Sequence, residues 1–352
     1  MSTKYYCIFD FVKFKWVNPL KTPLGDYAIK YSHFQVERDT YQTSPAKVEF
    51  TICSHGPDKI MTRNLSRTSE RFYGDENFFQ MDHQLGCRRW RSWVADLAQK
   101  HVRIWYHFPW YNRTKPVSWL SSDLLICFHV IQPILEYKLQ ELGVAVLHAA
   151  GAVKGDQALL LPGRGGVRKT TILMNLLKNG WGYLADDLIL LHRGKLYPNP
   201  QSPALFDYLF RNREDEHYTA RDYPKLLWHL WASRKVSYPI AGPTDLAGVV
   251  TLLRSSEPAE SITKEAGLID AAAIEKIVAI DRLARLNRVD YDDAMGRFML
   301  QLNQTQGLDT WERYWQKHRQ LLTENLTGLS HRELTIGPRV SSQDVSLLEQ
   351  MI

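Results

Sequence analysis

Short segments in which apolar and polar residues alternate fill residues 1–115, for example "YAIKYSHFQVE" and "AKVEFTIC". The turn sequences "PLGD" and "HGPD" lie between such segments. Alternation puts every second side chain on the same face of an extended strand. The pattern therefore predicts a strand-rich N-terminal domain over residues 1–115, a candidate for substrate recognition.

One segment of this region has a different period. In "CRRWRSWVADLAQKH", which runs from Cys87 to His101, the spacing of the large apolar residues fits one face of a helix. The residues concerned are Trp90, Trp93, Val94 and Leu97. We expect an amphipathic helix with these side chains in the core and its arginines on a solvated face.

From residue 116 onwards the pattern becomes that of an α/β domain, which we expect to extend to residue 352. A helix over Ser118 to Leu142 is followed by the strand "VAVLHAAGAV", a turn at "KGDQ", the strand "ALLL", the loop "PGRGGVRK" and the helix "TTILMNLLKNG". The apolar residues of the last helix fall on one face, and Asn179-Gly180 is a natural stop. Further along, "LAGVVTLLRSS" predicts a buried strand ending at Arg254, "GLIDAAAIEKIVAIDRLARL" a helix, and "ELTIGP" a final strand.

The loop between the strand "ALLL" and its helix has the composition of a phosphate-binding loop. In the pattern G-x-x-x-x-G-K-[ST], Gly163 is the first glycine, Lys169 the lysine that reaches the β- and γ-phosphates, and Thr170 the hydroxyl that holds Mg²⁺. Successive backbone N–H groups and the helix N-terminus attract phosphate oxygens. We expect nine residues to line the nucleotide: Gly163, Arg164, Gly165, Gly166, Val167, Arg168, Lys169, Thr170 and Thr171.

Arg168 stands where this pattern has its second glycine. A residue with a Cβ is compatible with the site if its backbone is right-handed and its side chain points away from the nucleotide. We expect this arrangement. The alternative is that Arg168 closes the phosphate site.

Two carboxylates follow the helix. In "GWGYLADDLILLHRGKLYP" a strand over Tyr183 to Ala185 ends in Asp186-Asp187, and a second strand begins at Leu188. Adjacent carboxylates beside a phosphate loop suit Mg²⁺ coordination and proton abstraction from an alcohol. A solvated turn is the alternative, although apolar runs flank this pair on both sides.

The motifs "LHAAGAV", "LLLPGRGGVRKTT" and "GWGYLADDLILL", in this order, resemble the kinase core of the HPr kinase/phosphorylase family, in particular its divergent relatives found beside peptide-modification genes. The resemblance covers residues 140–200 well, whereas the HPr-docking signature and the usual N-terminal domain are not recognisable. It implies an α/β fold with a P-loop kinase core of the HPr kinase type. It also implies that Asp186 is the base, that Asp187 and Thr170 hold the metal, and that His148 lies near the transferred phosphoryl group.

Composition adds limits to these expectations. The net charge of +6 comes from 44 basic residues scattered among 38 acidic ones, which permits an acidic partner without requiring one. Four widely spaced cysteines and the lack of a signal-like or membrane-like segment fit a cytoplasmic protein with no membrane association. The motif "CRRWRSW" could contact nucleic acid, but the mixed charge and the lack of a nucleic-acid motif argue against it.

We therefore expect an enzyme that uses Mg²⁺ and ATP to phosphorylate a hydroxyl, as a monomer or a homo-oligomer. The expected acceptor is a serine or threonine of a peptide or small protein, or a small alcohol. Asp186, His148 and Lys169 are the expected catalytic residues. Two alternatives are a nucleotidyl or other nucleotide-dependent transferase on the same core, and a non-catalytic peptide-binding module with a degenerate P-loop.

Overall fold

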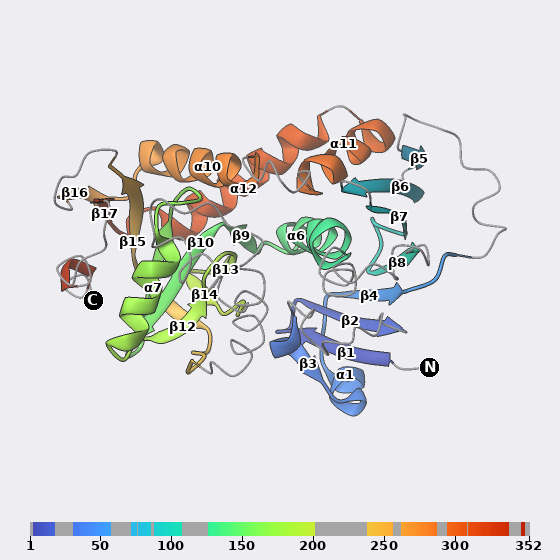
Figure 1. Ribbon diagram of the computed structural model, residues 1–352, viewed down its shortest axis with the longest axis horizontal. Coiled ribbons are helices and arrows are strands. Elements are labelled where there is room, and N and C mark those ends of the chain that lie inside the picture. Colours follow the sequence, from blue (N-terminus) through green and yellow to red (C-terminus); the bar gives the residue numbers. More distant parts are fainter. Residues whose placement is uncertain are drawn as a thin grey trace, which may run out of the picture. The chain divides into compact units, whose positions relative to one another are not determined.

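Two mixed sheets organise the chain, one in each of two units (Figure 1). The computed structural model describes residues 3–17, 31–57, 72–75, 77–85, 88–107, 126–200, 238–255, 262–286, 294–307, 309–337 and 346–348. The first unit comprises Met1–Leu142 and Arg288–Lys317, and the second comprises Gly143–Asn287 and His318–Ile352. The boundary expected near residue 115 lies outside the described residues.

The first unit contains an eight-stranded sheet with the order β3-β1-β2-β4-β8-β7-β6-β5. Its strands pair antiparallel except at β2–β4 and β4–β8, which are parallel. The strands are β1 (Thr3–Ile8), β2 (Val12–Val17), β3 (Gln35–Val36), β4 (Val48–Cys53), β5 (Phe72–Gly74), β6 (Phe78–Leu85), β7 (Arg88–Ala95) and β8 (His101–His107). In the described part of residues 1–115, the strand-rich prediction is confirmed.

The prediction of a helix over Cys87 to His101 is wrong, because this segment contains β7, a turn and the start of β8. β7 lies between β6 and β8, and both neighbours pair with its backbone. Trp90 and Trp93 are buried as expected, and the Trp93 indole donates to Gln80 Oε1 at 2.8 Å. Spacing alone is ambiguous for so short a run, and the two neighbouring strands decide in favour of extended backbone.

Besides the start of α12 (Thr310–Leu326), the described part of the first unit contains five short or long helices. They are η2 (Ser32–Phe34), α1 (Arg38–Thr43), the π-helix η3 (Cys127–Ile131), α6 (Gln132–Glu141) and α11 (Ala294–Gln306). Together, η3 and α6 confirm a helix in the described part of the segment expected over Ser118 to Leu142, with a π-helical first turn. Phe298 of α11 contacts Phe79 of β6 and Tyr137 of α6, so the helices pack on the sheet through aromatic rings.

The sheet of the second unit has the order β12-β10-β11-β15-β14-β13-β9, with β17 joined to β15 and β16 to β17. Its strands are β9 (Ala145–Leu147), β10 (Ala149–Lys154), β11 (Gln157–Pro162), β12 (Gly182–Ala185), β13 (Ile189–His192), β14 (Lys195–Tyr197), β15 (Thr244–Arg254), β16 (Ile262–Leu268) and β17 (Ser330–Ile336). β11 runs parallel to β15, and β15 runs parallel to β17. The strands expected after residue 140 are thus found, except that the single strand expected over Val144 to Val153 is divided at His148 into β9 and β10.

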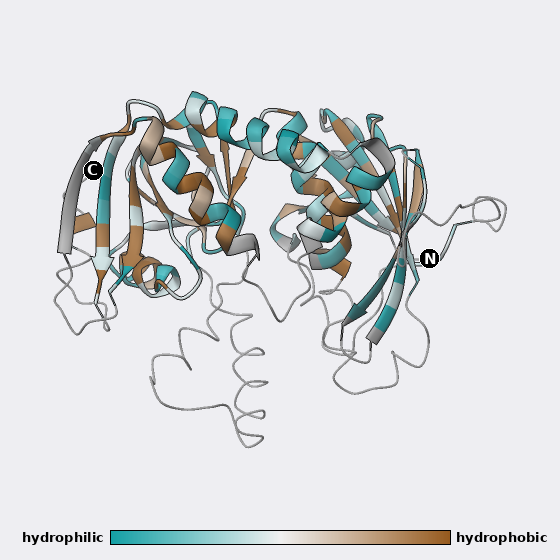
Figure 2. Ribbon diagram, turned by 90° about the horizontal axis from the view of Figure 1, so that it is seen from above, coloured by the Kyte–Doolittle hydropathy of each residue, from teal (hydrophilic) through white to brown (hydrophobic). Residues whose placement is uncertain are grey.

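Helices cover both faces of this second sheet (Figure 1). α7 (Lys169–Lys178) packs through Ile172, Leu173 and Leu176 against apolar residues of β10, β11, β15 and β17. On the opposite face, Lys276 of α10 (Ala271–Leu286) reaches Glu333, whose neighbour Leu334 faces α7. Figure 2 shows hydrophobic colouring along several strands of this sheet, while the helices carry both kinds of residue.

α12 (Thr310–Leu326) begins in the first unit and continues into the second. Among the described residues, none of the helices is both long enough and apolar enough to cross a membrane.

Candidate functional site

The glycine-rich loop, defined here as Gly163–Arg168, connects the carboxyl end of β11 to the start of α7. Gly163 forms a parallel bridge with Leu252 of β15. A Cβ on Gly163 would lie 2.6 Å from Val167 Cγ2 and 3.1 Å from Leu252 Cβ, so a larger residue would push the loop off the sheet. The Val167 side chain is buried under the loop, which anchors it.

Arg168 has φ 67° and ψ 29°, the left-handed conformation. The expectation of a right-handed arginine is therefore wrong. The chain must reverse sharply between the buried Val167 and the first turn of α7, and this reversal is the reason a glycine is favoured here. The left-handed region costs a non-glycine residue about 1–2 kcal/mol, so the loop keeps its shape at the expense of local strain.

α7 begins at Lys169, directly after the glycine-rich loop. A helix leaves its first N–H groups without intrahelical partners, and its dipole favours an anion there. The Arg168 side chain makes no capping hydrogen bond, as expected for a side chain that has only donors. Gly165 and Gly166 are exposed, and a Cβ on either would meet open space. The arrangement suits a phosphate group.

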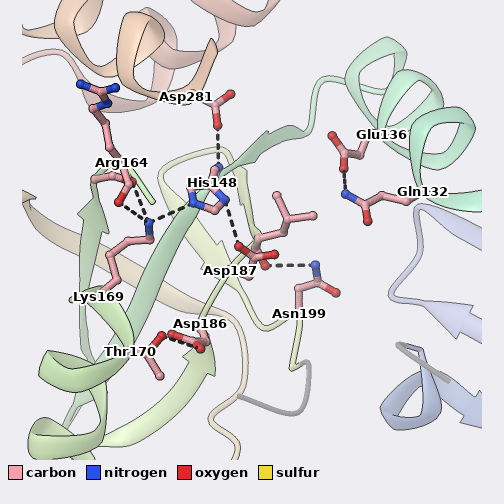
Figure 3. A network of polar contacts seen from close by, with 12 residues as sticks. Gln132, Glu136, His148, Arg164, Lys169, Thr170, Asp186, Asp187, Asn199 and Asp281 are labelled. Atoms are coloured by element: carbon pink, nitrogen blue, oxygen red, sulfur yellow. Dashed lines mark hydrogen bonds and ion pairs between the residues drawn. The ribbon is translucent and has the colours of Figure 1, made fainter. Parts of the chain in front are cut away.

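Lys169 is buried, and its ammonium group lies under the loop (Figure 3). Nζ donates to the carbonyl oxygens of Gly163 at 2.7 Å and Arg164 at 3.2 Å, and it lies 3.0 Å from His148 Nε2. An ammonium group has three donors and no acceptor, so these three contacts match its capacity. The carbonyl groups of Gly163 and Arg164 thus hold the lysine ammonium group beside the N-terminus of α7.

His148 connects the lysine to the carboxylate pair. It lies between β9 and β10, with Nε2 toward Lys169 and Nδ1 3.0 Å from Asp187 Oδ1 (Figure 3). Because a charged lysine can only donate, Nε2 accepts, and the ring of a neutral His148 carries its proton on Nδ1, facing Asp187. His148 therefore lies between a cation on its Nε2 side and a carboxylate on its Nδ1 side.

The two carboxylates at the end of β12 have different partners. Thr170 Oγ1 donates to Asp186 Oδ2 at 3.0 Å, whereas Asp187 contacts His148. Asp186 is buried, and the side chain of Asp187 is 26% exposed. The structure therefore brings Thr170 to Asp186 and not to Asp187, which is the residue that the family resemblance pairs with it.

A buried asparagine, which no sequence motif predicted, holds the carboxylate pair in place. Asn199 donates from its backbone N–H to the carbonyl of Leu184 at 3.0 Å and from Nδ2 to the carbonyl of Leu188 at 3.0 Å. These bonds clamp the chain on both sides of Asp186-Asp187. The only sequence signal is a polar residue in the proline-rich segment "YPNP" after β14.

A second missed feature lies on the helices. Asp281 of α10 accepts the backbone N–H of His148 at 2.6 Å through Oδ1, and its Oδ2 lies 3.1 Å from Nε2 of His318 in α12. Asp281 and His318 are 2% and 1% exposed. A charged residue in the apolar face of a helix was the available signal, since it is seldom buried without a partner.

The remaining expected residues lie at the edge of this site. Thr171 is in the first turn of α7, and the Arg164 side chain is exposed. Arg254 is exposed at the carboxyl end of β15, two residues after the Leu252 that bridges Gly163.

Within the described residues, no group of three or more His, Cys, Asp or Glu side chains is placed to hold a metal ion. A Mg²⁺ ion bound with a nucleotide uses only one or two protein ligands besides phosphate and water. In the comparisons with known proteins, neither a family model nor a curated protein matches the sequence.

Proposed function

We propose that the protein is a kinase that transfers the γ-phosphoryl group of ATP to a hydroxyl group. The observation that carries this proposal is the meeting of Lys169 and the Thr170–Asp186 pair at the N-terminus of α7, directly after a glycine-rich loop. A cation, a hydroxyl, a carboxylate and the N-terminus of a helix together are what phosphoryl transfer uses. The motifs that resemble the HPr kinase/phosphorylase family support the same chemistry.

The residues fit both substrate and metal. The backbone of the glycine-rich loop and the first turn of α7 would bind the phosphates, and Lys169 would exchange one of its present acceptors for a phosphate oxygen. Thr170 and Asp186 supply a hydroxyl and a carboxylate that are already in contact at 3.0 Å, the oxygen donors that Mg²⁺ prefers. When bound, Mg²⁺ neutralises charge on the phosphates.

The contacts favour an exchange of the two aspartate roles implied by the family resemblance. Asp186 is buried against Thr170, so it is better placed to hold the metal. Asp187 is more exposed and contacts His148, so it is better placed to accept the proton of an acceptor hydroxyl. His148 would then orient Asp187 through its Nδ1–H and steady Lys169 through Nε2.

The proposed acceptor is a serine or threonine of a peptide or small protein, or a small alcohol. This part of the proposal rests on the family resemblance alone. Nucleotidyl transfer on the same core is the competing reaction, because the same residues would bind the same nucleotide.

Intact-mass spectrometry of candidate peptides and alcohols after incubation with Mg·ATP tests the reaction. We expect a mass gain of one phosphate, dependent on the full-length protein; a gain of one nucleotide would establish nucleotidyl transfer instead. Lys169→Ala should abolish ATP binding measured by calorimetry. Lys178→Ala, an exposed lysine at the other end of α7, is the matched control and should bind as the wild type does. Equal affinity in both variants would contradict the assignment of the loop.

A further inference from the structure

A buried pair on two helices lies behind the candidate site. Asp281 accepts the backbone N–H of His148, and the same carboxylate contacts the ring of His318 through its other oxygen (Figure 3 shows Asp281 above His148). Both residues are almost completely buried. Placing a carboxylate in the interior is unfavourable unless its oxygens are engaged, so this one has a specific task.

The place where Asp281 acts is a break between strands. β9 ends at Leu147 and β10 begins at Ala149, so His148 belongs to neither strand. β9 pairs with β13, whereas β10 pairs with β11 and β12. The chain therefore changes the strands with which it pairs at His148. At this point the Asp281 carboxylate accepts a hydrogen bond from the backbone N–H of His148.

The position of this backbone controls the ring. His148 must present Nε2 to Lys169 at 3.0 Å and Nδ1 to Asp187 at 3.0 Å at the same time. A rotation of the backbone at His148 would separate the imidazole from either Lys169 or Asp187. Groups that hold a functional side chain through its neighbours commonly change activity about 10- to 100-fold when they are removed.

We propose that Asp281, supported by His318, is a positioning residue that holds the His148 ring in contact with both Lys169 and Asp187. The consequence for catalysis rests on the proposed function, whereas the consequence for the His148 ring does not. The competing explanation is that Asp281 and His318 only tie α10 to α12.

The chain provides a control for that explanation. Glu275 of α10 and Arg319 of α12 form an exposed ion pair between the same two helices, with side chains 55% and 45% exposed. Glu275→Gln loosens the helix pair without touching the His148 backbone.

The test is nitrogen-15 NMR of the imidazole rings in the full-length protein, with the His148 signals identified by their loss in His148→Gln. In the wild type we expect one set of ring signals, because both ring nitrogens have fixed partners. Asp281→Ala should shift or broaden these signals, because the ring would no longer be held against both partners. Asp281→Asn keeps an oxygen acceptor, so His148 should keep its pattern while the His318 signals change, because an amide NH₂ can face its ring.

Glu275→Gln should leave the His148 signals unchanged even if it lowers the melting temperature. A folded Asp281→Ala protein with wild-type His148 signals would overturn the proposal. Should Asp281→Ala fail to fold, Asp281→Glu moves the oxygens by one methylene while keeping the charge. It should disturb the His148 ring in the same direction, and an undisturbed ring would again overturn the proposal.

An activity measurement separates this proposal from the proposed function. If the wild type transfers phosphate, Asp281→Ala should lower the transfer rate about 10- to 100-fold while leaving ATP affinity close to the wild-type value, and Asp281→Asn should restore most of the rate. If the wild type transfers nothing, the kinase proposal fails, and the NMR result alone decides the role of Asp281.

Discussion

At the scale of single residues, Arg168 is the most informative position of the site. It has the left-handed conformation that a glycine would adopt without strain. The residues on either side of it are both buried: Val167 anchors the loop, and Lys169 provides the cation. The glycine-rich loop therefore keeps its shape with an arginine at this position, and the cost is a strained backbone at Arg168.

Replacing Arg168 by glycine should relieve this strain. A gain of about 1–2 kcal/mol from the backbone is partly offset by the greater freedom of glycine in the unfolded chain, about 0.5–1 kcal/mol. We expect Arg168→Gly to raise the free energy of unfolding, measured with urea, by about 0.5–1 kcal/mol and to retain ATP binding. Arg168→Ala keeps the strain and removes the guanidinium, so it should give no such gain.

Two outcomes would change this interpretation. An equal gain in Arg168→Ala would show that the side chain, not the backbone, is the source of the effect. ATP binding seen only in Arg168→Gly would mean that the arginine closes the site and that the protein is a binding module.

At the scale of elements, the turn between β12 and β13 places the carboxylates of Asp186 and Asp187 in different surroundings. The strands are buried and apolar, so the turn between them is fixed in position, and Asn199 clamps it from both sides. Adjacent residues at a strand end point in different directions. Asp186 consequently contacts Thr170 and Asp187 contacts His148.

The two aspartates should therefore respond differently to replacement by asparagine. Asp187→Asn should keep Mg·ATP affinity and lower the transfer rate about 10²–10⁴-fold, because an amide cannot accept the hydroxyl proton. Asp186→Asn should raise the Mg²⁺ concentration needed for half-maximal rate about tenfold or more, since a bond to a charged group contributes about 1.5–3 kcal/mol. Rate measurements across a Mg²⁺ titration distinguish the two. The reverse pattern would restore Asp186 as the base.

At the scale of the whole molecule, each unit has its own sheet and its own buried histidine with a shifted pKa. In the first unit, burial holds the pKa of His83 well below 6.5, and the charges of His129 and Arg297 act in the same direction. His83 Nε2 lies 2.7 Å from Ser92 Oγ, and its ring stacks on Trp90. In the second unit, burial is also the main cause that lowers the pKa of His331.

These shifts make the protein less stable in mild acid. The unfolded chain protonates its histidines as the pH falls below about 6.5, while the folded state keeps His83 neutral, so stability is lost below that pH and is retained above it. Between pH 7.5 and pH 5.5 the unfolded chain takes up a proton at His83 that the folded state does not, so the free energy of unfolding should fall. Urea unfolding of His83→Gln at both pH values should show a smaller loss of stability in acid than the wild type, and the loss that remains includes the contribution of His331. An unchanged pH dependence would rule His83 out as a source.

The sequence by itself determined the strand, loop and helix that carry Lys169 and Thr170, because turn chemistry and helical periodicity act over a few residues. It also determined that Trp90 and Trp93 are core residues, but not that they belong to a strand, since that depended on pairing with β6 and β8. Only the tertiary structure decided that Asp186 contacts Thr170, that Arg168 is left-handed, and that Asp281 holds His148 across 133 residues of chain. Such contacts join elements distant in sequence, and local patterns of hydrophobicity contain no information about which distant side chain will complete a buried hydrogen bond.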